Sequence, residues 1–108
     1  ILVRLAAAEP GNAERQSDLA VSHSRLGDVL RAGGDLVGAI SAYRASYDIR
    51  ERLAASNPDH AGWQRDLMMS CLKLSVTVPG ELVHWWRRAH RIARALAASG
   101  RLAPADEL

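Results

Sequence analysis

The 108-residue chain has no phenylalanine, a single lysine and a single cysteine, Cys71. One thiol cannot form a disulfide within the chain, which excludes the disulfide-stabilised folds of small secreted domains. No apolar run approaches the ~20 residues of a membrane-spanning helix, so the sequence contains no candidate span. The formal net charge is only +2, and this near balance indicates no particular class of charged partner.

What the chain does have is enough apolar residues, 48% of the total, for a hydrophobic core. Its length fits one domain or a part of a larger protein. Arginine supplies thirteen of the fourteen basic residues, and alanine is abundant. This composition is typical of a GC-rich genome, so we expect a bacterial protein, and we take the cytoplasm as its expected location.

The strongest pattern is an internal repeat at an offset of 48 residues. Residues 1–26 match residues 49–74 at twelve positions without a gap. In the first copy these positions are Ile1, Arg4, Leu5, Ala6, Ala7, Pro10, Ala13, Gln16, Asp18, Leu19, Ser22 and Leu26. Such self-similarity is typical of helical arrays, in which each unit packs on the next. Because residues 1–8 match 49–56, we expect them to end a helix of a preceding unit.

Two helices joined by a glycine turn are predicted for the first unit. Asn12 is a candidate cap for a helix over 13–32, which Gly33-Gly34 ends. Asp35 then caps a partner helix that runs to about residue 56. Apolar side chains at three- and four-residue steps are expected to face the partner helix: Leu19, His23, Leu26 and Leu30.

Four residues of this hairpin resemble the signature of the tetratricopeptide repeat, which reads Trp-x2-Leu-Gly-x2-Tyr, then Ala-x3-Phe, then Pro. They are Leu26, Gly27, Ala39 and Tyr43. His23 and Leu30 replace the usual aromatics, and the closing proline is displaced to Pro58. Two helices of about 20 residues each make a pair longer than the ~34-residue standard unit. The resemblance is therefore to an extended variant with the proportions of kinesin-light-chain-type repeats.

The resemblance implies an all-α fold in which antiparallel helical hairpins stack as a right-handed α-solenoid. We expect a single array over residues 1–108. Its parts are the end of a preceding repeat (1–9), a first repeat (12–57), a shortened second repeat (59–100) and the start of a further helix or a tail (103–108).

The second unit departs from the first in its first helix. Asp59 is the expected cap, Ser75 stands where the first unit has Gly27, and Pro79-Gly80 arrives early. The partner helix returns at an offset of 43, so that Trp86 takes the place of Tyr43. We expect one continuous apolar core through four side chains: Leu26, Tyr43, Leu74 and Trp86.

The resemblance also implies that the first helix of each pair lines a concave surface, which holds a peptide or a partner helix of another protein. The candidate partner-binding residues are Ser24, Arg25, Asp28, Arg31, Met69, Leu72 and Lys73. The cations among them suit a carboxylate of the partner. Alternatively, these residues form a solvated helix face in which Arg25 or Arg31 pairs with Asp28.

A basic amphipathic helix is predicted over 81–99. Its cationic residues are Arg87, Arg88, Arg91 and Arg94, opposite an apolar side made of Leu82, Trp85, Trp86, Ala89, Ile92, Ala93 and Leu96. Such a helix can bind nucleic acid or an anionic surface. Alternatively, its arginines lie on the outer face of the last helix and keep the end of the array soluble. A third possibility is a structural module that self-associates through exposed array ends.

No pattern in the chain indicates catalysis, a metal or a cofactor. The histidines His23, His60, His84 and His90 have no metal-ligand spacing, and neither a phosphate-binding loop nor a nucleophile elbow occurs. Cys71 aligns with His23 and is predicted to be a small buried hydrophobe. Trp63 and Trp85 are either core or binding-surface aromatics. We therefore predict a non-enzymatic protein without a cofactor.

Overall fold

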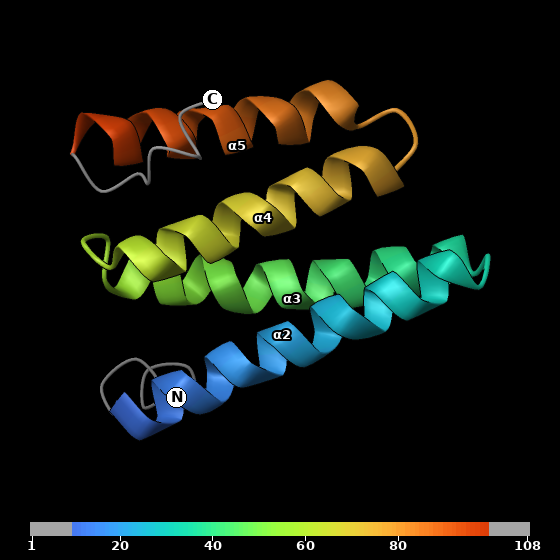
Figure 1. Cartoon of the computed structure of the whole chain (residues 1–108), viewed down its shortest axis with the longest axis horizontal. Helices are drawn as coiled ribbons and strands as arrows, with labels where there is room; N and C mark the ends of the chain where they lie inside the picture. Colours follow the sequence, from blue (N-terminus) through green and yellow to red (C-terminus); the bar gives the residue numbers. More distant parts are fainter. Residues whose placement is uncertain (1–9, 100–108) are drawn as a thin grey trace.

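A computed structural model describes residues 10–99 as four helices and the turns between them (Figure 1). The helices are α2 (Pro10–Ala32), α3 (Leu36–Ser56), α4 (Ala61–Thr77) and α5 (Leu82–Ala98). Residues 10–99 contain no strand, so the predicted all-α class is confirmed for this part of the chain. The expectations for 1–9 and 103–108 lie outside the described residues.

The helices lie side by side in chain order, and each reverses the direction of the one before (Figure 1). α2 packs on α3, α3 on α4, and α4 on α5. Among the described helices, α3 and α4 are therefore covered from two sides, whereas α2 and α5 are each covered from one.

Side-chain caps fix where two of the helices start. Asp35 accepts a hydrogen bond from the Gly38 amide at 2.9 Å and begins α3 as predicted. The prediction of Asp59 as the cap of α4 is wrong, because His60 occupies that position and its Nδ1 accepts from the Trp63 amide at 3.1 Å. The predicted cap Asn12 lies inside α2, which begins at Pro10; proline is favourable in a first turn.

The face of α2 that packs on α3 consists of small residues. Ala20 and Ser24 are buried there, and Gly27 lies directly beneath the Tyr43 ring. The predicted face is wrong for Leu19 and Leu26, which are 44% and 49% exposed, whereas Leu30 is half-buried and packs against the main core. Small residues let the backbones of α2 and α3 approach closely, and this turns the bulky leucines outward.

The main core joins α3, α4 and α5. Tyr43, Cys71 and Leu74 are almost completely buried in it, and burial raises the pKa of the Cys71 thiol to about 11. The predicted core is thus correct for Tyr43 and Leu74, but Leu26 and Trp86 do not belong to it. Trp86 is 52% exposed, and the buried aromatic of α5 is the preceding residue, Trp85. One residue along a helix is a rotation of about 100°, so the two tryptophans cannot both face α4.

A buried arginine connects α3 to α4. The Arg50 side chain donates from Nη1 to Ser70 Oγ at 2.8 Å and to the Asp66 carbonyl at 3.4 Å. Its Nε is buried without a hydrogen-bond partner, and burial lowers the pKa of Arg50 from its ordinary value. Because a buried cation is costly unless it is hydrogen-bonded, the Ser70 hydroxyl stabilises this junction.

Gly27→Ala should destabilise the fold. A Cβ at this position would lie 2.6 Å from two Tyr43 ring carbons, and such overpacking typically costs about 1–3 kcal/mol. Gly33→Ala is the control, because its Cβ would approach nothing closer than the Val29 carbonyl at 3.5 Å. Urea unfolding measures both variants, and a Gly27→Ala protein as stable as Gly33→Ala would contradict the close approach.

Ser70→Ala should lower the free energy of unfolding by about 1.5–3 kcal/mol, the usual worth of a hydrogen bond to a charged group. Ser22 is the counterpart of Ser70 at the 48-residue offset, but it is exposed. Ser22→Ala is therefore a matched control that changes the same helix propensity without removing the bond to Arg50. Equal effects in thermal or urea unfolding would show that the Ser70 hydroxyl contributes nothing.

Candidate partner-binding surface

A polar network connects α2 and α4, whose interacting residues are more than 40 positions apart. The Lys73 ammonium donates to both carboxylate oxygens of Asp28 at 3.0 Å and to Ser24 Oγ at 3.0 Å. Farther along α2, Arg31 Nη1 donates to Thr77 Oγ1 at 3.5 Å. The first helices of the two units therefore lie next to each other along this edge of the array.

Tyr43 joins the same network from α3. Its hydroxyl donates to Asp28, and the Lys73 ammonium lies 5.6 Å from the centre of its ring. The hydrogen bond from Tyr43 lowers the pKa of Asp28 below its ordinary value, an effect to which Lys73 adds. Burial, together with the bond to Asp28, raises the pKa of Tyr43 to about 12. At neutral pH the carboxylate is ionised and the phenol is not, which is the combination that this hydrogen bond requires.

The predicted partner-binding residues fall into two groups. Ser24 is buried beneath Lys73, Leu72 is half-buried against the core, and Arg31 reaches across to α4. Arg31 is nevertheless exposed, as are Arg25, Asp28 and Met69, and Lys73 is half-buried. The alternative of a solvated face predicts a local pair of Asp28 with Arg25 or Arg31, whereas the salt bridge of Asp28 is with Lys73 of α4.

Val76 was missed by the sequence reasoning, although it is 66% exposed. The repeat contained the signal. At the 48-residue offset Val21, Arg25 and Asp28 of α2 correspond to Met69, Lys73 and Val76 of α4. Each set has the three- and four-residue steps of one helix face, so Val76 belongs to the same face of α4 as the predicted residues Met69 and Lys73.

We call these six residues the α2–α4 surface: Val21, Arg25, Asp28, Met69, Lys73 and Val76. Its apolar part comes chiefly from Met69 and Val76, which are 47% and 66% exposed. Lys73 and Asp28 neutralise each other between the two helices, while Arg25 is an exposed cation. The surface can therefore take apolar side chains together with a carboxylate.

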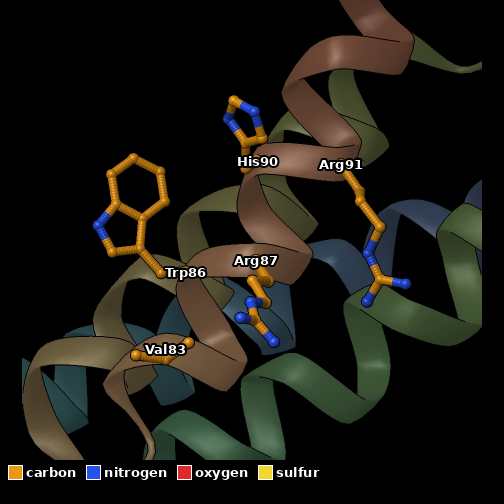
Figure 2. Close-up of a pocket in the computed structure, with 5 residues that line it drawn as sticks. All are labelled: Val83, Trp86, Arg87, His90 and Arg91. Atoms are coloured by element: carbon orange, nitrogen blue, oxygen red, sulfur yellow. The ribbon is translucent and has the colours of Figure 1, made fainter.

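The basic side of α5 is divided between two environments. Arg87, Arg91 and Arg94 are exposed, whereas Arg88 pairs with Glu51 at 3.1 Å and lies over the Tyr47 ring. Figure 2 shows a surface pocket lined by Val83, Trp86, Arg87, His90 and Arg91. The Trp86 indole extends away from the ribbon and Arg91 turns to the other side, so the lining side chains do not converge on one point (Figure 2).

Within residues 10–99, His, Cys, Asp and Glu side chains form no group of three or more that could hold a metal ion. None of the four described helices combines the length and apolar character that crossing a membrane requires. Cys71 is fully buried with a raised pKa, so its thiolate is not available as a nucleophile at neutral pH.

Alkaline pH should destabilise the protein through Tyr43. The folded protein binds the phenolic proton more tightly than the unfolded chain does, because the pKa rises from 10.0 to about 12 on folding. This stabilisation is complete below about pH 10 and is lost as the pH rises towards 12. Urea unfolding between pH 8 and 12 should show a larger loss for the wild type than for Tyr43→Phe. Parallel losses in the two proteins would rule out this contribution of Tyr43.

No protein-family model, curated protein sequence or solved structure matches this chain. Function is therefore inferred from the internal repeat and from the geometry of the α2–α4 surface.

Proposed function

We propose that the chain is a protein-interaction module, an extended helical repeat similar to the tetratricopeptide type, that binds a peptide or a partner helix on the α2–α4 surface. One observation supports this function above all. The bond between Lys73 and Asp28 holds the first helices of the two units, α4 and α2, next to each other, with Met69 and Val76 exposed beside it.

The chemistry of the surface describes the partner. Met69 is flexible and polarizable, so it can adapt to apolar side chains of different shapes. Val76 adds a second apolar contact about two helical turns away. Arg25 can form a bidentate pair with a carboxylate, for which its planar guanidinium is suited. The preferred ligand is thus a segment that presents two apolar side chains and an Asp or Glu.

Rigidity of the scaffold favours this binding. Asp28 is held by Lys73 and Tyr43, and all three belong to different helices. The side chains of Asp28 and Lys73 are therefore already ordered before a ligand binds. Binding avoids the entropic cost of ordering them, which is about 0.5–1.5 kcal/mol per side chain. In a solenoid with a concave inner surface, as the resemblance implies, further units would extend the same surface.

Selection of random peptides on the immobilised chain tests the proposal. Enriched sequences should combine apolar residues with an acidic one. The double variant Arg25→Ala with Met69→Ala should bind them at least tenfold more weakly, because it removes the carboxylate partner and one apolar contact. Fluorescence anisotropy with a labelled peptide measures the affinity.

The matched control is Arg52→Ala with Val37→Ala, which removes one exposed arginine and one exposed apolar residue of α3. This variant should bind as the wild type does. Peptides that bind the two double variants equally well would place the binding site elsewhere. A selection that enriches no peptide would contradict the proposed function.

A further inference from the structure

α5 carries a line of arginines on its solvent side. Arg87, Arg91 and Arg94 are all exposed. Because they follow one another at steps of four and three residues, they lie within an arc of about 60° and span about 10 Å along the helix. We call these three residues the arginine ridge. Opposite the ridge lie the buried side chains of α5: Trp85, Ala89 and Leu96.

The exposure of the arginine ridge does not depend on whether a further helix packs beside α5. The 43-residue offset relates the ridge to three positions of α3, which are Arg44, Asp48 and Glu51. All three are exposed, although α2 packs on one side of α3 and α4 on the other. The ridge positions are therefore solvent-facing even on a second helix that is covered from both sides.

The acids of the neighbouring helix do not neutralise the ridge. Glu51 of α3 pairs with Arg88, and Glu81 at the start of α5 pairs with Arg44 of α3. The other exposed charges of α3 balance, since they are one acid and one base: Asp48 and Arg52. Within residues 10–99 no arginine of the ridge forms a salt bridge. Three positive charges therefore face solvent without a counter-charge from α3 or α5.

The charge of α5 sets it apart from the other described helices. Of the four, α5 alone contains no acidic residue. α2 also has three exposed arginines, but three exposed acids are interspersed with them, so its exposed charges cancel. These residues are Arg15, Arg25 and Arg31, with Glu14, Asp18 and Asp28.

A row of guanidinium groups suits phosphates. Each guanidinium can donate to two phosphate oxygens at once, and every nucleotide of a nucleic acid strand offers one phosphate. Interfaces with nucleic acid are more polar and more positively charged than interfaces between proteins, which have an apolar core. The exposed large apolar residues of α5 all precede the ridge in sequence: Leu82, Val83 and Trp86. The ridge itself thus has the composition of a surface that contacts phosphates.

The packing of α5 favours nucleic acid over an anionic membrane. A helix that binds in the membrane interface inserts its apolar face among the lipids. The apolar face of α5 is instead committed to the main core, where Trp85 and Ala89 are buried. The exposed Trp86 is turned about 100° away from Arg87, so it does not extend the ridge.

We propose that the arginine ridge binds the phosphate backbone of a nucleic acid duplex without reading its sequence. This function is separate from peptide binding, because the α2–α4 surface belongs to other helices. A duplex is the expected form, since binding of single strands relies on aromatic side chains that stack with the bases, and the ridge has none. Contacts to phosphates alone carry no sequence information.

Fluorescence anisotropy of the full 108-residue chain with labelled random-sequence duplexes, one of DNA and one of RNA, tests the proposal. The wild type should bind at least one of them at about 50 mM salt. Up to about 200 mM salt, the logarithm of its affinity should fall against the logarithm of the salt concentration with a slope of about −2.7, the value for three phosphate contacts. Arg87→Gln with Arg91→Gln leaves one contact, so it should bind at least tenfold more weakly and reduce the slope to about −0.9.

Arg15→Gln with Arg31→Gln is the matched control. It removes the same charge from α2, at the opposite end of the row of helices (Figure 1), and should bind as the wild type does. Circular dichroism verifies that both variants keep their helix content, which glutamine favours about as much as arginine does.

Three results would overturn the proposal. The first is a wild type that binds neither duplex at about 50 mM salt. The second is an equal loss of affinity in the two double variants, which would show that net charge alone matters. The third is binding to phosphatidylserine vesicles without binding to either duplex, which would make the ridge a membrane contact. Peptide affinity is measured separately, so a failure of duplex binding leaves the α2–α4 surface untouched.

Discussion

The packing of the Tyr43 ring on the bare backbone of Gly27 is the contact on which the arrangement of the first three helices depends. It fixes the close approach of α2 and α3. The hydroxyl of the same side chain reaches Asp28, and Asp28 holds Lys73 of α4. A single aromatic residue therefore sets the spacing of one helix pair and also positions the next helix. A larger residue at position 27 would disturb both, because the ring cannot move without changing the bond to Asp28.

The two units place the same residue types in different environments, and this difference follows from position in the array. Ser70 bonds a buried arginine, whereas its counterpart Ser22 lies in water. Leu74 is completely buried and Leu26 is half exposed. Each Å² of apolar surface left in water forgoes about 25 cal/mol of burial free energy, so the half-exposed Leu26 contributes less to stability than the buried Leu74.

The repeat at an offset of 48 predicted the helical class correctly, and the glycine turn and Asp35 placed the start of α3 correctly. Two kinds of information were missing from it. The offset identifies equivalent positions but not whether a neighbour covers them, which is why Leu26 and Trp86 were wrongly assigned to the core. Leucine spacing also suggested the wrong face of α2, because Ala20, Ser24 and Gly27 determine the close packing through their small size.

At the α2–α4 surface, sequence reasoning found the accessible residues Arg25, Asp28, Met69 and Lys73. It also included Ser24, which is buried. The pairing of Asp28 with Lys73 could not be predicted from spacing within one helix, since it joins residues 45 positions apart. Val76 was within reach of the sequence, because it lies three residues after Lys73 and seven after Met69, on the same face of the helix.

Nuclear Overhauser effects between the Tyr43 ring protons and the Gly27 α-protons test the central contact most directly. The account predicts strong cross-peaks from the ring to these α-protons, because the ring carbons would lie only 2.6 Å from a Cβ at this position. Absence of these cross-peaks in the folded protein would contradict the close approach of α2 and α3, and with it the arrangement of the helices that follow.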